Sequence, residues 1–373
     1  MLSPKKTYEF LLNAGFEFFT GVPDSLLKDF ISYISDITEK SNHVIAANEG
    51  NAIALAAGYY LGKGLPAFVY MQNSGIGNAI NPLISLADRK VYSMPMMLMI
   101  GWRGEPGVKD EPQHITQGRV MIKLLDSIEI PWFILDAKSD LESVLSKAID
   151  NMNRNSSPVA LLVKKDTFEQ YLKPRANNNY LMTREQAIHL IVDTLDKKDA
   201  FISTTGMTSR ELYEYRISKG ESLNNDFLTV GGMGHASSIA MGLSLAKKNR
   251  RIVCIDGDGS VIMHLGSMAL IGQSEISNLV HIVINNGSHD SVGGQPTVGF
   301  LINLTSIAKA CGYKKIESVS NPKDLTEFLI SITNFNGPVF LEILVRKGFR
   351  VNLGRPTTLP VENKIGFMNG MLN

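Results

Sequence analysis

The sequence predicts an α/β protein made of two doubly wound domains, each built on a parallel sheet. Short apolar runs alternate with helix-like stretches, and each run ends in a polar or glycine-rich turn, which is typical of parallel strands joined by crossover helices. Proline, asparagines and charged residues interrupt this alternation in residues 171–182, after which it restarts. The same order of elements therefore occurs twice.

The interruption predicts the domain limits. We expect an N-terminal domain in residues 1–172, a linker in residues 173–182 and a C-terminal domain with a tail in residues 183–373. A chain of 373 residues is long enough for two domains of ordinary size. The linker is too short to hold a middle domain.

Composition and charge indicate a globular chain. The residues are 44% apolar and 20% charged, and the formal net charge is +1. This balance supplies no basic footprint for nucleic acid or a membrane surface, so we expect neither partner. The longest apolar run, residues 94–100, is too short to span a bilayer, and the N-terminus lacks a signal-peptide layout. We therefore expect a cytoplasmic protein whose two cysteines, Cys254 and Cys311, are buried bystanders without metal spacing.

The expected elements of the N-terminal domain follow in order. Gly15 ends the first helix, and Asp24 or Ser25 caps the second. His114 lies in a loop bounded by proline and glycine, residues 111–118. Helices are expected at residues 5–14, at 26–35 and from 48 onward, and strands at 16–19, 44–47, 67–71, 95–100, 132–135 and 159–163. In the C-terminal domain, helices are expected at residues 183–195 and 209–215 and strands at 200–204, 251–256, 279–284 and 339–345.

Two strand ends in the C-terminal domain carry the strongest chemical signal. The strand at 251–256 runs into GDGS, and the strand at 279–284 runs into NNG. A helix-like stretch joins them, so the two strands form a βαβ unit whose turns meet at one edge of the sheet. Asp258 and Asn286 then lie side by side and suit a hard cation such as Mg²⁺. The alternative is that GDG is an ordinary glycine turn and NNG a loop signal.

Glu49 is a second candidate. It enters a helix composed largely of small and apolar residues, where a carboxylate loses water and its neutral acid form is favoured. The alternative is a carboxylate stabilised by the N-terminus of its own helix.

The spacing of GDG and NN resembles that of the thiamine-diphosphate-dependent 2-keto acid decarboxylase family. The resemblance implies the thiamine-diphosphate-binding fold, with a pyrimidine-side N-terminal domain, a diphosphate-side C-terminal domain and no middle domain. It also implies that Asp258, Asn286 and the carbonyl of Ser288 bind Mg²⁺. Glu49 would contact the aminopyrimidine of the cofactor and take part in its proton transfer.

The same resemblance implies roles for further residues. Met233 would bend the cofactor, and the Gly231 carbonyl would accept a hydrogen bond from its amino group. The remaining implied cofactor contacts are Gly206, Met207, Thr208, Gly257, Gly259, Ser260 and Ser288. Asp24, His114 and His289 are implied catalytic residues beside Glu49, and His289 with Asp290 should face the substrate. The implied substrate contacts are Ser25, Arg103, Lys109 and His114.

Residues 20–25, 101–107 and 354–357 resemble the phosphonopyruvate decarboxylase branch of this family. This implies decarboxylation of 3-phosphonopyruvate to phosphonoacetaldehyde and CO₂ through an adduct of the thiamine ylide, within phosphonate biosynthesis. It also implies a homo-oligomer with active sites at subunit interfaces. The alternatives are a sulfopyruvate decarboxylase, a non-catalytic cofactor-binding subunit and, more distantly, a nicotinamide oxidoreductase, although a G-x-G-x-x-G fingerprint opening a helix is absent from the sequence.

Overall fold

The computed structural model of the chain describes residues 1–172 and 178–372. The chain divides into two compact units, Met1–Arg175 and Ala176–Asn373. The predicted linker, residues 173–182, falls partly on residues 173–177, which lie outside the described residues.

The N-terminal unit contains a six-stranded sheet in its described residues, with the order β2-β1-β3-β4-β6-β5 and every pairing parallel. Its strands are β1 (Phe19–Gly21), β2 (His43–Ile45), β3 (Ala67–Gln72), β4 (Met96–Gly101), β5 (Trp132–Leu135) and β6 (Val159–Val163). Its helices are α1 (Pro4–Asn13), α2 (Lys28–Ile37), α3 (Glu49–Lys63), α4 (Ile76–Pro82), α5 (Pro112–Ser127) and α6 (Leu141–Asn155), with single turns η1 (Asn73–Gly75) and η2 (Leu83–Ala87).

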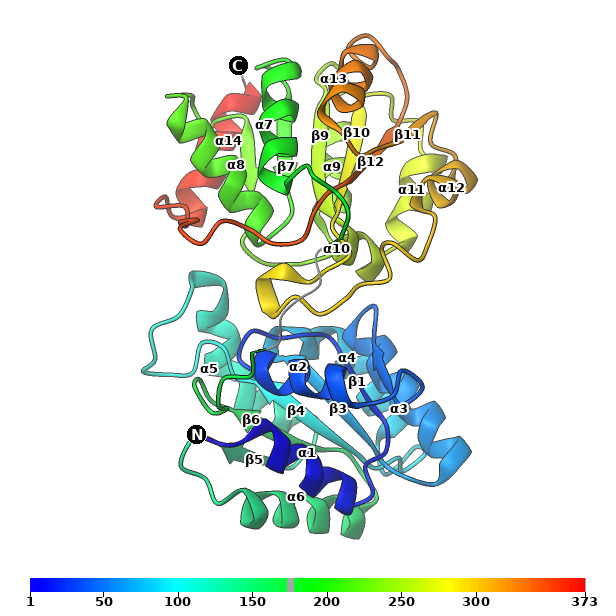
Figure 1. Ribbon diagram of the computed structural model, residues 1–373, viewed down its shortest axis with the longest axis vertical. Coiled ribbons are helices and arrows are strands. Elements are labelled where there is room, and N and C mark those ends of the chain that lie inside the picture. Colours follow the sequence, from blue (N-terminus) through cyan, green and yellow to red (C-terminus); the bar gives the residue numbers. More distant parts are fainter. Residues whose placement is uncertain (173–177, 373) are drawn as a thin grey trace. The chain divides into compact units, whose positions relative to one another are not determined.

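Helices cover both faces of this sheet (Figure 1). On one face α3, α4 and α5 pack against Val69 and Leu98. On the other face α1, α2 and α6 pack against Phe68 and Met97. Because successive side chains of a strand point to opposite faces, β3 and β4 are apolar at nearly every position. This explains why the sequence shows unbroken apolar runs there rather than alternation.

The C-terminal unit repeats this architecture with the order β11-β12-β10-β9-β7-β8, again with every pairing parallel. Its strands are β7 (Ala200–Ser203), β8 (Asp226–Leu228), β9 (Ile252–Gly257), β10 (Leu279–Asn285), β11 (Lys315–Val319) and β12 (Val339–Leu344). Its helices are α7 (Arg184–Thr194), α8 (Met207–Ser218), α9 (Ala236–Ala246), α10 (Asp258–Met263), α11 (Gly266–Gln273), α12 (Leu304–Cys311), α13 (Pro322–Ser331) and α14 (Pro360–Leu372), with the turn η3 (Asp290–Val292). The predicted fold class, two parallel sheets each flanked by helices, is confirmed.

Three local predictions are wrong. The strand expected at residues 16–19 is β1, and it begins only at Phe19. The Phe16 amide donates a hydrogen bond to Leu11 O at the end of α1 and therefore takes no part in the sheet. Neither Asp24 nor Ser25 is the N-cap of α2: the helix begins at Lys28, and Asp24 instead accepts a hydrogen bond from the Leu26 amide.

The third error concerns His114, which lies in the first turn of α5 rather than in a loop. Pro112 occupies the start of that helix, where its fixed φ favours helix formation and its missing amide hydrogen has no consequence. A proline that suggested a loop therefore marks a helix start.

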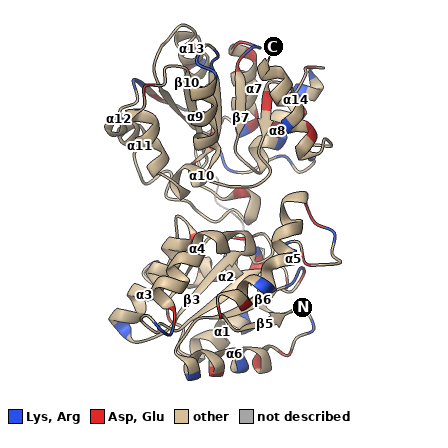
Figure 2. Ribbon diagram, turned by 180° about the vertical axis from the view of Figure 1, so that it is seen from behind, with Lys and Arg blue, Asp and Glu red and all other residues tan. Residues whose placement is uncertain are grey.

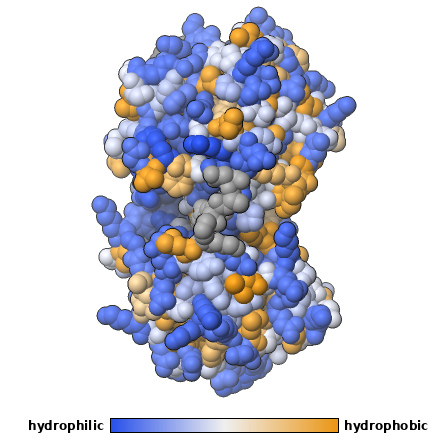
Figure 3. Space-filling model, viewed as in Figure 1, coloured by the Kyte–Doolittle hydropathy of each residue, from blue (hydrophilic) through white to orange (hydrophobic). Residues whose placement is uncertain are grey.

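The outer surface mixes charges and isolated apolar side chains. Acidic and basic residues both occur along α6 (Figure 2). On the face shown in Figure 3, apolar residues lie singly or in small groups among hydrophilic ones. Within the described residues, no helix is both long enough and apolar enough to cross a membrane.

Candidate active site

The parallel pairing of β9 and β10 brings the two predicted metal ligands to one place. Ile284 of β10 pairs with Gly257 of β9. Asp258 begins α10 directly after β9, and Asn286 is the first residue after β10. Both side chains are buried, and both line one cavity of about 90 Å³ at the carboxyl ends of these strands.

Most of the cofactor-binding residues predicted in this unit line the same cavity. They are Met207, Thr208, Met233, Gly257, Gly259, Ser260 and Ser288, together with the predicted metal ligands Asp258 and Asn286. Gly206 and Gly231 are predicted contacts that are not among the lining residues. Gly206 immediately precedes α8 with a φ of 95°, a left-handed conformation that favours glycine, so it shapes the start of that helix.

Asp258 is a carboxylate in a nearly dry environment. Burial raises its pKa to about 6, although hydrogen bonds from Thr297 and from the backbone amides of Asn286 and Gly259 oppose this shift. Ser288 is also buried, and its Oγ has no hydrogen-bond partner among the described residues. Asp258 therefore offers a carboxylate oxygen, Asn286 an amide oxygen and Ser288 the backbone carbonyl predicted to bind Mg²⁺, and this set of hard oxygen donors fits that ion.

A buried ionic network holds Asn286. Its Nδ2 donates to Asp290 Oδ2 at 2.7 Å, and its Oδ1 accepts from the Ser288 amide at 3.0 Å. Asp290 Oδ2 also accepts from Arg184 Nη1 at 3.2 Å. The Arg184 guanidinium makes two further hydrogen bonds, of 2.8 and 3.0 Å, with the buried Glu211 carboxylate. Asp290 thus binds Asn286 and Arg184 and, like His289, lines the cavity.

Arg184 lines the cavity but was missed by the sequence analysis. One signal was available. It is the first residue of α7, behind a Thr183–Gln186 capping box, and a cation is unfavourable at a helix N-terminus. A basic residue at that position indicates an acidic partner from elsewhere in the chain.

Hydroxyl groups and a helix start line the other side of the cavity. Ser260 Oγ accepts hydrogen bonds from the Thr204 hydroxyl and the Gly234 amide, both at 3.1 Å. Helix α8 begins at Met207 and presents its free backbone amides beside Thr208, which is buried. Amides and hydroxyls at a helix start suit an anionic group such as a diphosphate.

His289 lines the cavity as predicted for a residue near the reaction centre. Burial lowers its pKa to about 4, so its imidazole is neutral at physiological pH. A neutral imidazole in this position can accept or share a proton but adds no fixed positive charge.

In the N-terminal unit, Glu49 is the first residue of α3 and is buried. The helix is capped by Asn48, whose side chain accepts from the Asn51 amide at 2.9 Å. Asn78 Nδ2 donates to Glu49 Oε2 at 2.7 Å. One carboxylate oxygen is therefore fixed by a neutral donor rather than by a cation.

Asp24 lies at the carboxyl end of β1 and is completely buried. It accepts hydrogen bonds from Gln72 Nε2 at 2.7 Å and from the Leu26 amide at 2.8 Å. Burial raises the pKa of Asp24, although these hydrogen bonds and the nearby Arg103 act in the opposite direction. Asp24 is thus a buried carboxyl group held by two neutral donors.

The predicted substrate contacts Arg103 and Ser25 touch each other, since Arg103 Nη1 donates to Ser25 Oγ at 2.8 Å. The guanidinium also forms a two-point contact with the Asp110 carboxylate. Lys109 is exposed on the same loop. A substrate anion that binds Arg103 would therefore have to compete with Asp110.

His114 is buried, which lowers its pKa, and the neighbouring Arg103 lowers it further. Its Nδ1 has no hydrogen-bond partner among the described residues. The Gln117 side chain lies near the ring and opposes the fall in its pKa.

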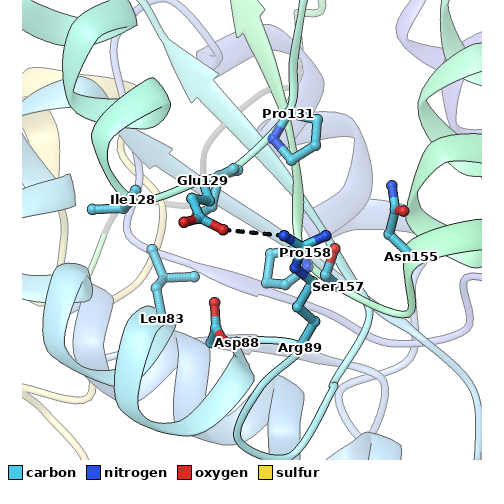
Figure 4. A pocket seen from close by; sticks show the side chains of 10 residues that line it. Leu83, Asp88, Arg89, Ile128, Glu129, Pro131, Asn155, Ser157 and Pro158 are labelled. Atoms are coloured by element: carbon cyan, nitrogen blue, oxygen red, sulfur yellow. Dashed lines mark hydrogen bonds and ion pairs between the residues drawn. The ribbon is translucent and has the colours of Figure 1, made fainter.

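Another small cavity, of about 70 Å³, is shown in Figure 4. Most of its lining residues directly precede β5 or β6, and the others lie between α4 and β4. It holds an ion pair between Arg89 and Glu129 with an N–O distance of 3.2 Å. It lies at the amino ends of the strands, whereas the predicted site residues follow the carboxyl ends.

The two units match known cofactor-binding domains. Residues 6–127 match the thiamine pyrophosphate enzyme, N-terminal TPP binding domain, and residues 204–343 match the C-terminal TPP binding domain. The phosphonopyruvate decarboxylase of Streptomyces viridochromogenes is 35% identical over 360 residues, which cover 92% of this chain and 88% of that protein. That of Streptomyces hygroscopicus is 34% identical over 380 residues, covering 97% and 92%. A sulfopyruvate decarboxylase of Methanosarcina acetivorans is 24% identical over 367 residues, covering 92% and 91%.

These matches confirm the predicted family and the expectation that no middle domain is present, and they set aside the nicotinamide alternative. Glu49 falls within the N-terminal match, and Asp258 and Asn286 fall within the C-terminal one. The chain belongs to the family of thiamine-pyrophosphate-dependent decarboxylases, and phosphonopyruvate decarboxylases are among its relatives.

Proposed function

We propose that this enzyme decarboxylates 3-phosphonopyruvate to phosphonoacetaldehyde and CO₂, as a step of phosphonate biosynthesis, with thiamine diphosphate and Mg²⁺. The observation that carries the proposal is the buried cavity in which Asp258, Asn286 and Ser288 converge beside the start of α8. The two relatives named phosphonopyruvate decarboxylase support the choice of substrate.

The diphosphate-side domain, residues 183–373, would hold Mg²⁺ through Asp258, Asn286 and Ser288. The backbone amides at the start of α8, with Thr208 and Ser260, would hold the diphosphate. Met233 lines the same cavity and would support the cofactor rings. When bound, thiamine diphosphate supplies the carbon nucleophile and accepts the electron pair released with CO₂.

The pyrimidine-side domain, residues 1–172, would supply the proton-transfer groups. Asn78 fixes Oε2 of Glu49, so we assign Oε1 to the ring nitrogen of the cofactor. Burial raises the pKa of Asp24, and Nδ1 of His114 has no hydrogen-bond partner among the described residues. Either group can return a proton to the reacting carbon after CO₂ leaves, and His289 can share a proton from the other unit.

The substrate is a multiply charged anion, and its phosphonate needs fixed positive charge. A guanidinium pairs well with phosphonate oxygens, so Arg103 is the proposed contact, assisted by Ser25, Lys109 and His114. The two-point contact with Asp110 holds the guanidinium in place. A substrate anion must compete with Asp110 for the guanidinium, and of two similar substrates the more strongly charged one competes better.

We further propose a homo-oligomer in which the two kinds of domain from different subunits complete each active site. An apolar hollow of about 590 Å³ on the N-terminal unit supports this proposal. It is lined by Phe18, Asn51, Ala54, Leu55, Gly58 and Tyr59, mostly from the helix that begins with Glu49. An apolar surface of this kind is typical of subunit contacts.

The purified enzyme is expected to convert 3-phosphonopyruvate to phosphonoacetaldehyde only when thiamine diphosphate and Mg²⁺ are both present. Phosphorus NMR of the reaction follows the loss of substrate and the appearance of aldehyde. Sulfopyruvate should react more slowly, because a sulfonate has one negative charge fewer to offer Arg103. Faster turnover of sulfopyruvate would identify the protein as a sulfopyruvate decarboxylase. No turnover of either acid would favour a non-catalytic subunit.

Replacing Glu49 by glutamine keeps the side-chain size and the contact with Asn78 but removes the titrating proton. The turnover number should fall by about 10²–10⁴-fold, which is the usual contribution of general acid–base catalysis, while cofactor binding is retained. Steady-state rates and calorimetric titration with cofactor measure the two quantities. Glu142→Gln, on α6, is the matched control. Near-normal turnover of Glu49→Gln would remove the proton-transfer role.

Asp258→Asn preserves shape but removes the charge that we assign to Mg²⁺. The variant should lose more cofactor affinity than the roughly 10–100-fold that outer-shell substitutions cost. Equilibrium dialysis of cofactor at several Mg²⁺ concentrations measures the loss, and Asp150→Asn, an exposed residue of α6, is the control. A variant that still retains cofactor in a Mg²⁺-dependent way contradicts the assignment.

Arg184→Gln should leave Asp290 without its cation and loosen Asn286. The Mg²⁺ concentration needed for half-maximal cofactor binding should rise by about 10–100-fold. Arg216→Gln is a matched control, because Arg216 forms a comparable buried pair with Asp226 and is not among the residues that line the cavity. If both variants lose thermal stability but show the same Mg²⁺ requirement, Arg184 has only a structural role.

A further inference from the structure

A second group of potential metal ligands lies inside the C-terminal sheet. Cys254 and Asp256 are two residues apart on β9 and therefore point to the same face. His281 of β10 pairs directly with Cys254. All three side chains are completely buried. No metal spacing is visible around Cys254 in the sequence because its neighbour His281 comes from another strand.

The three side chains are close enough to share one ion. The Sγ atom, a carboxylate oxygen and a ring nitrogen all lie within 4.8 Å of one another. His281 Nε2 and Asp256 Oδ2 are 3.6 Å apart. A tetrahedral ion with bonds of about 2.0–2.3 Å to nitrogen, oxygen and sulfur separates its ligands by distances close to this one. Only small side-chain adjustments are therefore needed.

Two of these atoms are unsatisfied where water cannot reach them. Neither Asp256 Oδ2 nor His281 Nε2 has a hydrogen-bond partner among the described residues. Unpaired buried polar atoms are rare and costly in native proteins. The other polar atom of each side chain is occupied: Asp256 Oδ1 accepts from the Gly257 amide at 2.9 Å, and His281 Nδ1 contacts the Tyr313 hydroxyl at 3.0 Å. Each residue thus directs one free atom into the group.

The Tyr313 contact has the form of a support for a metal-binding histidine. Such histidines usually use their second ring nitrogen in a hydrogen bond that fixes the tautomer and the ring orientation. If Nδ1 carries the proton and donates it to Tyr313, the lone pair of Nε2 faces the Asp256 carboxylate. Two acceptors that face each other in a dry interior are unfavourable, and a cation between them would relieve this.

The donor set indicates which cation. Thiolate sulfur, imidazole nitrogen and one carboxylate oxygen suit Zn²⁺ and similar borderline ions, whereas Mg²⁺ and Ca²⁺ prefer oxygen alone. Burial raises the pKa of the Cys254 thiol well above its usual range, so a bound cation is what would stabilise the thiolate here.

We propose that Cys254, Asp256 and His281 bind a structural Zn²⁺-class ion in the core of the C-terminal unit. Binding releases the thiol proton to solvent as the metal–sulfur bond forms. The ion would link β9 to β10 within the sheet, ahead of the strand ends that lead to Asp258 and Asn286. The site is independent of the Mg²⁺ ion proposed for catalysis, since it shares none of its ligands.

Metal analysis of the full-length protein tests the proposal. Protein produced in zinc-supplemented medium, then dialysed against EDTA without thiamine diphosphate, should retain about one Zn²⁺ per chain. Cys311→Ser should retain the same amount, and Cys254→Ser should lose most of it. Folded wild-type protein without bound metal, or Cys254→Ser with undiminished metal, overturns the proposal.

Cobalt provides a reading that does not depend on a core substitution. The chain has two cysteines, so a thiolate-to-cobalt charge-transfer band in the Cys311→Ser variant must come from Cys254. That band is the expected result for Cys311→Ser produced with Co²⁺, and it decides the question even if Cys254→Ser fails to fold. A folded Cys311→Ser protein that shows no such band after Co²⁺ loading overturns the proposal, and the pair of His281 and Asp256 then shares a proton instead.

Discussion

The register of β10 against β9 is the constraint on which the C-terminal site depends. Because Ile284 pairs with Gly257, the residues that follow each strand leave the sheet side by side, and Asp258 meets Asn286. A shift by one residue would exchange the two faces of a strand and separate these side chains. Apolar clusters on both faces of the sheet oppose such a shift. Core packing therefore positions the chemistry as directly as the polar contacts do.

The charged groups of the two sites differ in whether a group of opposite charge already balances them. Arg184 lies between two carboxylates, and Arg103 is held by Asp110. These cations are bound and oriented before any ligand arrives. Asp258, in contrast, is bonded by a hydroxyl and backbone amides. A buried carboxylate whose partners are all neutral has no positive charge to balance its own charge. The proposed Mg²⁺ would supply that charge.

Local patterns were sufficient to predict the fold class and the cavity residues that follow strands. GDGS and NNG are each only a few residues long and can be recognised locally. The parallel topology of the sheet then brings them together. The Arg184–Asp290 contact joins residues that are 106 positions apart. The place of Arg184 at a helix start indicates an acidic partner, but no local pattern identifies Asp290 as that partner. The error at His114 has a different origin: proline favours both loops and helix starts, and only the packing of α5 on its sheet decides between them.

Glycine, like proline, has more than one structural role, and three glycines here leave room for a carboxylate. Three buried carboxylates each lie against a glycine where an added Cβ would approach a carboxylate oxygen to 2.1–2.6 Å. The pairs are Gly75 with Glu49, Gly101 with Asp24 and Gly299 with Asp258. None of these glycines has a positive φ, so each is needed for space rather than for a turn. In all three cases backbone covers one side of the carboxylate and excludes water there. A side chain larger than glycine at any of these three positions would collide with the carboxylate, so the close approach of backbone is part of how each carboxylate is kept from water.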